Sequence, residues 1–370
     1  MAEGLKLPII DLSSPDRTSS ARLIRQACME CGFFYLVNHG VEEELLGRVF
    51  DQSSKFFSLP LEVKSKLARK QNRGYTALFA ENLDPTASSK GDSKESFYIG
   101  PLEDATQNKL NQWPSEDILP SWRPTMESYY KKVLSTGKRL LSLIALALNL
   151  DEDFFEKVGG LNKHTALLRL LHYPGQLGSS DEEVLGASAH SDYGTVTLLA
   201  SNGVPGLQVC REKSKQPRVW EDVIHIDGAF IVNIGDLMER WTNCLFQSTV
   251  HRVIPAGQER YSVAFFLDPN EDSLVECLAS CCNESLPPRC NNYPLQGIRT
   301  LQINAQYPSR LTTLIIIKCF MGRLRPCNWW TMLVKLPFNR VLVLFSTKPR
   351  NRYYTSNLSD TKSLLQVTTN

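Results

Sequence analysis

Between residues 167 and 267 the sequence consists of short strand-like runs separated by turn signals, and this pattern restricts the fold more than any other feature. Pro-Gly and Asn-Gly pairs mark the turns, because glycine and proline supply backbone conformations that strand interiors do not use. Many short strands at close spacing predict a sandwich or a barrel. The expected strands are residues 167–173, 195–200, 207–210, 229–234, 249–254 and 262–267.

The chain before these strands has a different period, since its apolar residues recur at helical spacing. Helices are expected over residues 20–31, 42–58 and 120–148, with a short one after Pro60 and strands over 33–37 and 95–99. Helices followed by many strands indicate an α+β protein with a jelly-roll core and a helical N-terminal region. Residues 71–93 are expected to form a mobile loop. Lys94 and Glu95 follow it and are expected to lie on the surface, with a position facing the substrate as the alternative.

Two histidines and one aspartate in the strand-rich part have the pattern of a metal site. His190 and Asp192 are two residues apart, so on a β-strand both side chains would point to the same face. His251, on a distant strand, can supply a third ligand. Two imidazoles and one carboxylate that leave the other metal positions open are typical of non-haem Fe(II) oxygenases. His190, Asp192 and His251 are therefore the predicted iron ligands.

A second pair of polar residues follows the last histidine. Arg260 and Ser262 lie nine and eleven residues after His251, at strand spacing, and together make a receptor for a carboxylate. Tyr173, on an earlier expected strand, can add a hydrogen bond. A metal triad followed by a carboxylate receptor predicts an iron enzyme with an organic acid as co-substrate. A 2-oxo acid would occupy two open metal positions and O2 the third.

Composition and charge fit an ordinary globular protein with an unusual C-terminal segment. Hydrophobic residues make up 42% of the chain and charged residues 22%. No apolar run approaches the length of a membrane span and no secretory signal is evident, so we expect a cytoplasmic protein whose ten cysteines are free thiols. From Arg289 onward, 12 Lys and Arg residues stand against one acidic residue, and the apolar pattern loses its period.

The motifs around these residues resemble those of plant-type 2-oxoglutarate- and Fe(II)-dependent dioxygenases. This family includes flavonol synthase, gibberellin oxidases and, more distantly, isopenicillin N synthase. The resemblance covers roughly residues 5–289. It is carried by Cys31-Gly-Phe-Phe-Tyr-Leu-Val-Asn-His-Gly40, Gly186-Ala-Ser-Ala-His-Ser-Asp-Tyr-Gly-Thr195, Val232-Asn-Ile-Gly-Asp236, Ser248-Thr-Val-His-Arg-Val253 and Arg260-Tyr-Ser-Val263.

The resemblance implies a distorted double-stranded β-helix in which His190, Asp192 and His251 bind iron. It implies that Arg260 and Ser262, with Tyr173, bind 2-oxoglutarate, which is decarboxylated to succinate and CO2 while a small organic substrate is hydroxylated or desaturated. Ascorbate is the expected reductant. An N-terminal dioxygenase region at 5–120 and a catalytic core at 163–270 are expected, in a monomer of plant secondary metabolism. The substrate and O2 are the expected partners, with neither specific nucleic acid nor membrane.

Two departures from the family pattern stand out. Many members have Asn-Tyr-Tyr-Pro where this chain has Leu171-His-Tyr-Pro174, so only Tyr173 carries over. The chain therefore resembles a dark- or senescence-induced plant group more than the main flavonoid branch. The second departure is the segment 290–370, which does not resemble the family's C-terminal region. We hypothesise that it derives from an alternative splice or a retained non-coding segment and forms a disordered or non-native tail.

Two other functions stay open on the sequence alone. An oxidase on the same scaffold would use no 2-oxoglutarate, and Arg260 and Ser262 would then hold a carboxylate of the substrate. A catalytically silent binding protein would result if the altered tail prevented the site from closing. The intact triad argues against loss of iron, and the identity of the substrate is beyond the sequence.

Overall fold

A computed structural model of the chain describes most of its first 294 residues and four strands beyond them. The described ranges are 5–84, 91–103, 105–158, 165–175, 185–212, 215, 217–270, 274–288, 293–294, 313–315, 330–336, 340–347 and 350–357. The chain divides into two compact units, Met1–Pro294 and Leu295–Asn370. All of the residues predicted to form a site belong to the first unit.

The first unit contains both helices and strands. Its helices are α1 Arg17–Glu30, α2 Glu43–Phe57, α3 Leu61–Ser65, α4 Ala105–Asn108, α5 Trp122–Ala147, α6 Phe154–Lys157 and α7 Asp236–Trp241, followed by the 3-10 helix Ala279–Cys281. Its first strands are β1 Ile9–Asp11, β2 Phe33–Val37, β3 Gly74–Thr76, β4 Glu95–Ile99, β5 Leu167–Tyr173, β6 Ala187–His190 and β7 Val196–Ser201. They are followed by β8 Leu207–Cys210, β9 Glu221–Asp222, β10 Phe230–Ile234, β11 Val250–Val253, β12 Arg260–Leu267, β13 Leu274–Val275 and β14 Tyr293–Pro294.

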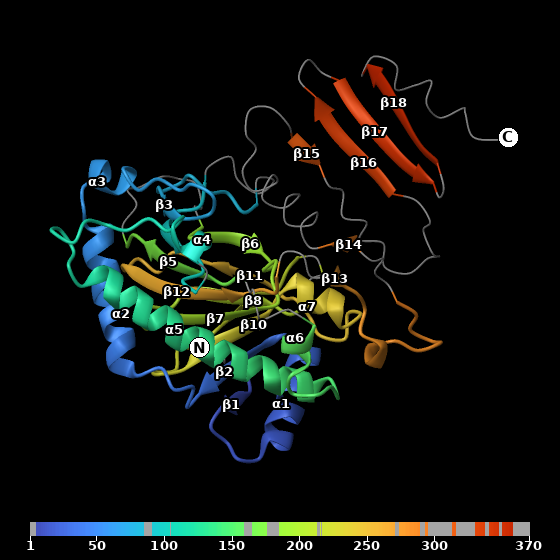
Figure 1. The fold of residues 1–370 in the computed structure, drawn as a ribbon, viewed down its shortest axis with the longest axis horizontal. Helices are drawn as coiled ribbons and strands as arrows, with labels where there is room; N and C mark the ends of the chain where they lie inside the picture. The colour runs from blue at the N-terminus through green and yellow to red at the C-terminus, as the bar shows by residue number, and fades with distance from the viewer. Residues whose placement is uncertain are drawn as a thin grey trace. The chain divides into compact units, whose positions relative to one another are not determined.

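Two sheets form the β-sheet core of this unit. The larger sheet has eight strands in the order β1-β2-β10-β7-β12-β5-β4-β3, and the smaller sheet has four in the order β6-β11-β8-β9. Apolar side chains from both sheets make one buried cluster, which includes Tyr35 and Leu171 from the larger sheet and Val209 and Val253 from the smaller. This arrangement confirms the predicted α+β fold with a double-stranded β-helix core (Figure 1).

The register of the larger sheet determines which side chains face the smaller sheet. β5 and β12 are antiparallel, with Tyr173 opposite Arg260 and Leu171 opposite Ser262. Side chains two residues apart on a strand share a face. These four side chains therefore point together into the space between the sheets, where all of them line one cavity.

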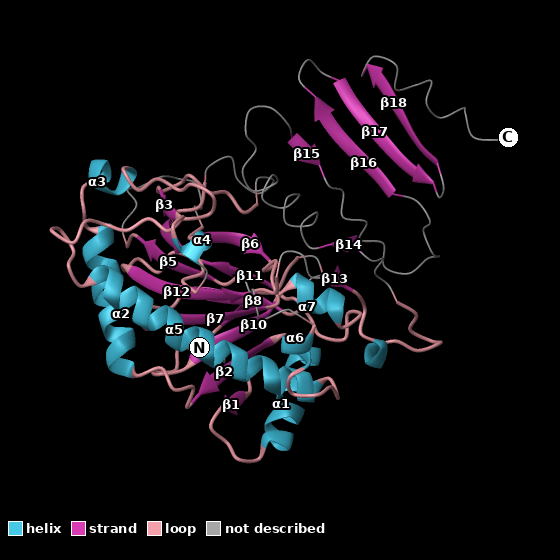
Figure 2. Ribbon diagram, in the orientation of Figure 1, coloured by secondary structure: helices cyan, strands magenta, loops and turns pink. Residues whose placement is uncertain are grey.

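Helices pack against the larger sheet. α5 contacts β12, while α1 and α2 contact α5, so the three helices form a layer on this sheet (Figure 2). Aromatic pairs fill the interface: the rings of Tyr130 and Phe265 lie 5.2 Å apart and those of Phe97 and Trp122 lie 5.1 Å apart. In the described part of the chain, no helix combines the length and apolarity needed to cross a membrane.

Most predicted elements have the expected positions. β2, β4, β5 and β8 have the predicted bounds, and α1, α2 and α5 begin and end within three residues of the prediction. Gly32 ends α1 as expected, because it adopts a φ of +71°, where larger residues are strained. A Cβ at this position would also lie 2.0 Å from the carbonyl oxygen of Gln247. Glycine is therefore required at this position for two reasons, the positive φ and the lack of space for a side chain.

Two expectations about the region before β4 are wrong in the part that the structure describes. The stretch 71–93 is not simply a mobile loop, since it contributes β3 and buries Glu81 and Asp92. Lys94 and Glu95 do not lie on the surface, because both side chains are buried and ion-paired. Charged residues next to a turn-rich segment suggested exposure, but Asp92 and Glu81 pair with Lys94, and the distant Lys64 and His172 pair with Glu95, which makes burial possible.

The second unit contains four described strands, where the sequence pattern indicated no regular structure. They are β15 Thr313–Ile315, β16 Trp330–Leu336, β17 Arg340–Thr347 and β18 Arg350–Asn357. They form an antiparallel sheet in the order β15-β16-β17-β18. The rest of the expected tail, apart from β14, lies outside the described residues.

Candidate metal centre and co-substrate pocket

The three predicted metal ligands meet between the two sheets. His190 on β6 pairs directly with His251 on β11, and their ring centroids are 4.3 Å apart. Oδ1 of Asp192 lies 3.7 Å from Nε2 of each histidine. One ligand atom from each residue lies within 4.8 Å of the others. The expectation that Asp192 lies on the same strand as His190 is wrong, because β6 ends at His190 and the residues that follow the strand bring Asp192 to the site.

Hydrogen bonds to backbone carbonyl oxygens fix the orientation of both imidazole rings. His190 Nδ1 lies 2.7 Å from the carbonyl oxygen of Ser188, and His251 Nδ1 lies 3.0 Å from that of Thr249. Because a carbonyl only accepts, both Nδ1 atoms must carry the proton, which leaves both Nε2 atoms as lone-pair donors to a metal. Burial, together with the neighbouring His251, lowers the pKa of His190 to about 4. The imidazole of His190 is thus prepared in the neutral form that metals bind.

Asp192 is oriented by two residues that the sequence reasoning did not identify as functional. Thr197 Oγ1 donates to Asp192 Oδ2 at 2.6 Å, and Asn233 Nδ2 donates to the same oxygen at 2.8 Å. Oδ1 is therefore the oxygen that faces the imidazoles. Burial raises the pKa of Asp192, but His251, His190 and these hydrogen bonds outweigh it and lower the pKa overall. Asn233 belongs to the Val232-Asn-Ile-Gly-Asp236 motif, whose chemical role only the structure reveals.

The donor set suits Fe(II). Two imidazoles and one carboxylate, with ligand atoms within 4.8 Å of one another, are the donor set of the facial triad in non-haem iron sites. The buried hydrogen-bonding partners of all three ligands hold this arrangement before any ion binds. Among the described residues, no other group of three metal-binding side chains comes this close together.

Arg260 and Ser262 present unused hydrogen-bond donors to the same cavity. Both side chains are buried, at 3% and 2% exposure, and neither Arg260 Nη1 nor Ser262 Oγ has a hydrogen-bond partner. The Nε atom of Arg260 donates to the carbonyl oxygen of Val204 at 3.2 Å, which fixes the direction of the guanidinium. Burial lowers the pKa of Arg260, while Tyr173 opposes this shift. A buried cation with free donors is suited to an anionic ligand.

Tyr173 is the last residue of β5, the strand on which it was expected from the sequence. Its ring is 5.0 Å from the guanidinium carbon of Arg260, opposite it on the neighbouring strand. Leu171, which stands where many family members have asparagine, is opposite Ser262 and lines the cavity as an apolar residue. The polar end of the cavity is therefore made by Arg260, Ser262 and Tyr173.

The triad and the carboxylate receptor share one cavity with apolar walls. Its empty volume, which includes space open to the solvent, is about 560 Å³. The residues Lys94 and Arg169 add two further cations to the lining. The apolar lining comes from Phe33, Leu83, Leu171, Ala187, Leu199, Leu207, Val253, Ala264 and Phe266.

Family models match the two parts of the chain that build this site. Residues 7–116 match the model described as non-haem dioxygenase in morphine synthesis N-terminal. Residues 164–269 match the model of the 2OG-Fe(II) oxygenase superfamily. The second match includes all six predicted site residues.

Relatives that cover about three quarters of this chain include two plant synthases. Kihadalactone A synthase LFS of Citrus sinensis is 41% identical over 300 residues, which cover 77% of this chain and 89% of the relative. Azadirone synthase LFS of Melia azedarach is 40% identical over 294 residues, which cover 76% and 87%. These plant enzymes share the family, and their names describe their own products.

Solved structures share the fold. A full-length Neurospora crassa protein, crystallised in complex with alpha-KG, has a TM-score of 0.72 at 30% identity, over 83% of this chain and 98% of that chain. JOX2 in complex with 2OG, Fe and JA has a TM-score of 0.68 at 30% identity, over 80% and 85%. The family matches, the relatives and the triad agree, and the chain belongs to the 2OG-Fe(II) oxygenase superfamily as a dioxygenase that uses Fe(II) and 2-oxoglutarate.

Proposed function

We propose that His190, Asp192 and His251 hold Fe(II), and that Arg260, Ser262 and Tyr173 hold the distal carboxylate of 2-oxoglutarate. The observation that carries this assignment is a pair of unpartnered buried donors, Arg260 Nη1 and Ser262 Oγ, in the cavity that contains the triad. Leaving such donors buried without a ligand is costly. A carboxylate would satisfy both and would neutralise the guanidinium.

The chain's own residues would bind, orient and shield the reactants. When bound, the iron and its co-substrate supply the oxidising chemistry that breaks a C–H bond. Arg260 sets the distance of the co-substrate from the triad, because the Val204 carbonyl fixes its guanidinium. Thr197 and Asn233 keep one oxygen of Asp192 occupied, so that Asp192 offers a single oxygen to the metal. The apolar walls exclude bulk water from the reaction.

The cavity favours a largely apolar small molecule as substrate. Leucine, valine, alanine and phenylalanine make up nine of its 19 lining residues, so shape and apolar contact would contribute strongly to recognition. The plant relatives support a role in plant secondary metabolism. All six proposed residues come from one chain, which supports a monomer as the active form. Hydroxylation and desaturation are both compatible with this site.

The first test is 2-oxoglutarate turnover by the purified chain with Fe(II), ascorbate and O2. Ascorbate is the proposed reductant that keeps iron in the ferrous state. Wild-type protein is expected to release succinate slowly without the substrate. Arg260→Ala should lower kcat/KM for 2-oxoglutarate by about 100-fold or more, because the buried carboxylate of 2-oxoglutarate would lose the cation that pairs with it. Arg211→Ala is the matched control, since Arg211 is paired with Glu221 outside the cavity.

The two variants separate the outcomes. Succinate from wild type and Arg211→Ala, with little from Arg260→Ala, supports the assignment. Equal turnover by Arg260→Ala would contradict the role of Arg260 in co-substrate binding. Absence of succinate from a wild-type chain that binds one equivalent of Fe(II) would contradict the proposed co-substrate chemistry as a whole.

A further inference from the structure

The strand that carries His190 has weak support within its own sheet. β6 has four residues and is the outermost strand of the smaller sheet, where among the described strands it pairs only with β11. The pairing is irregular between His251 and Val253. An edge strand without a second neighbour moves more easily than a central one. His190 therefore needs support from outside the sheet if it is to hold a metal in a fixed geometry.

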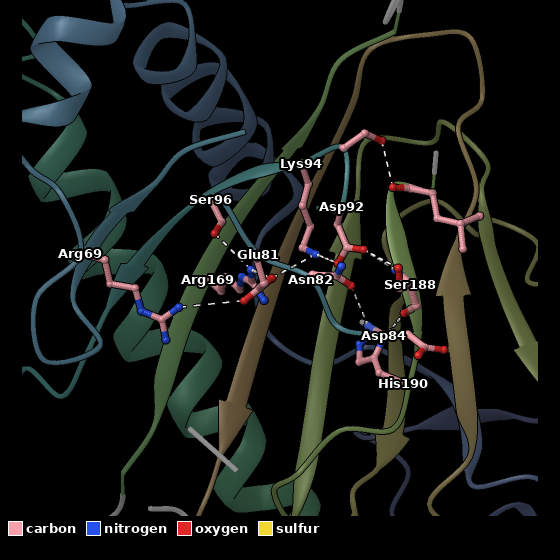
Figure 3. A network of polar contacts seen from close by, with 12 residues as sticks. Arg69, Glu81, Asn82, Asp84, Asp92, Lys94, Ser96, Arg169, Ser188 and His190 are labelled. Carbon is pink, nitrogen blue, oxygen red and sulfur yellow. Dashed lines mark hydrogen bonds and ion pairs between the residues drawn. The ribbon is translucent and has the colours of Figure 1, made fainter. Parts of the chain in front are cut away.

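The segment just before β4 supplies this support. Ser93 donates to the carbonyl oxygen of Leu185 from both its backbone nitrogen, at 2.9 Å, and its hydroxyl, at 3.0 Å. Asp92 Oδ1 accepts from the backbone nitrogen of Ser188 at 3.1 Å and from its hydroxyl at 2.5 Å. The carbonyl oxygen of Ser188 in turn accepts the Nδ1 proton of His190 at 2.7 Å. One buried carboxylate is thus two hydrogen bonds away from the imidazole (Figure 3).

Asp92 is itself held by a buried ion cluster. Lys94 Nζ contacts Asp92 Oδ2, and it lies 3.0 Å from Glu81 Oε2. Arg169 Nη2 also reaches Glu81 Oε2, at 2.5 Å. The side chains of Asp92, Lys94 and Glu81 are each about 2% exposed. A buried carboxylate with a fixed cation is rigid, because any movement would leave an uncompensated charge.

The other histidine is supported differently. The hydroxyl of Thr249 donates to the carbonyl oxygen of Cys31, which follows α1 and precedes β2. β11, which carries His251, lies between β6 and β8 inside its sheet. His251 therefore has a strand on each side, whereas His190 depends on the segment Asp92–Lys94. No sequence pattern indicates this difference, because Asp92 is 96 positions away from Ser188.

We propose that Asp92 is a positioning residue for the metal centre, which clamps the outer edge of β6 through Ser188 and so holds His190 in place. The inference rests on the proposed role of His190 as an iron ligand. Residues that hold metal ligands commonly affect metal affinity by about 10- to 100-fold when they are removed. Asp92 does not contact the metal or the co-substrate, and it acts through Ser188.

The test measures binding of Mn(II), as an air-stable substitute for Fe(II), by the loss of the free-ion EPR signal on titration of the full-length chain. Asp92→Ala should weaken Mn(II) binding by about 10- to 100-fold and should broaden the signal of the bound ion. Glu95→Gln is the control, since it also removes a buried carboxylate that pairs with a lysine, but Glu95 contacts Lys64, His172 and Tyr75 rather than β6 or Asp92. It should change affinity by less than about threefold. Thermal midpoints without metal are measured in parallel.

A second pair of variants keeps the test decisive if Asp92→Ala does not fold. Ser188→Ala removes only the 2.5 Å hydroxyl bond to Asp92, whereas Ser96→Ala removes a hydroxyl that contacts Arg169 in the same cluster. Ser188→Ala should weaken Mn(II) binding several-fold and Ser96→Ala should not. Equal effects within either pair, or wild-type affinity in Asp92→Ala, would overturn the role of Asp92. A wild-type chain without Mn(II) affinity would instead overturn the proposed metal centre, and this inference with it.

Discussion

The atoms of Arg260 and Ser262 that carry their proposed function also cost the fold stability. Arg260 Nη1 and Ser262 Oγ are buried donors without partners, and each such group disfavours the ligand-free fold. The arrangement is explained if a ligand completes their hydrogen bonds. Binding energy would then include the relief of this penalty, and the folded chain would be most stable with its co-substrate present.

Ser262→Ala should therefore have opposite effects on stability and on binding. Without ligands, the free energy of unfolding should rise by about 1 kcal/mol, because an unsatisfied buried hydroxyl is removed. The KM for 2-oxoglutarate should rise about three- to tenfold, since one hydrogen bond to its carboxylate is lost. Chemical denaturation and succinate release measure the two effects. A variant that is less stable and binds 2-oxoglutarate normally would show that the hydroxyl is structural.

Among single residues, the sequence predicts best those whose side-chain type is required by the group that they would bind. His190, Asp192, His251, Arg260 and Ser262 are recognisable because metals and carboxylates demand particular side chains at particular spacings. The structure brings all five into one cavity. The residues that orient them, such as Thr197 and Asp92, were not predictable. Their hydrogen bonds join positions that no periodic sequence pattern connects.

Strands made by continuous apolar runs were predictable, whereas their charged ends were not. β4, β5 and β8 match the predicted bounds, because continuous apolar runs between turn signals leave little choice. The start of β4 was assigned to the surface because Lys94 and Glu95 are charged. Their burial depends on Glu81, Lys64 and His172, which come from other segments and become neighbours only after folding.

Glu95 connects three elements and should make the stability of the fold depend on pH. Its carboxylate contacts Lys64 of α3 at 2.8 Å, His172 of β5 at 2.8 Å, and the hydroxyl of Tyr75 in β3. Burial raises the pKa of Glu95, but the hydrogen bonds from His172, Lys64 and Tyr75 outweigh it, so the pKa in the folded protein is below its usual value of 4.5. The stabilisation is complete above this value and is lost as pH falls through the lower pKa of the folded state.

Glu95→Gln should lower the free energy of unfolding at pH 7 by about 2 kcal/mol, since hydrogen bonds to a charged acceptor are weakened. The loss should shrink as pH falls below the usual carboxyl pKa of 4.5, because the wild-type carboxylate becomes protonated as well. Urea unfolding at a series of pH values measures both. Glu42→Gln is the control, because Glu42 pairs with Lys132 at the exposed surface, and its removal should have little effect at any pH. A loss for Glu95→Gln that stays constant from neutral pH down into the acid range would contradict this account.

The whole chain consists of a catalytic unit and a second unit of different character. The proposed site lies within Met1–Pro294, and the match to the Neurospora crassa protein covers 98% of that solved chain but 83% of this one. The second unit is strongly basic and contains the four-stranded sheet β15-β16-β17-β18. We propose that the segment after residue 294 is not needed for the metal centre.

A chain that ends at Pro294 should fold and bind Mn(II) as tightly as the full chain does, within about threefold. The cut is placed after β14 rather than at residue 289, because β14 pairs with β13 of the first unit. Limited proteolysis of the full chain should likewise give a resistant fragment that ends near this residue. Mass spectrometry identifies the fragment. A full-length chain that resists cleavage to Asn370, together with a shortened chain that fails to fold, would show that the two units depend on each other.

The three proposed ligands come from distant parts of the chain, and this links metal supply to the lifetime of the protein. An ion bound to both His190 and His251 closes a loop of about 60 residues, and closing a long loop restricts the unfolded chain. Since the ion binds the folded site, it shifts the folding equilibrium in proportion to the logarithm of its free concentration. A shortage of iron in the cell would then lower the activity of the enzyme and also its amount. More of the metal-free chain would be unfolded, and unfolded chains are degraded faster.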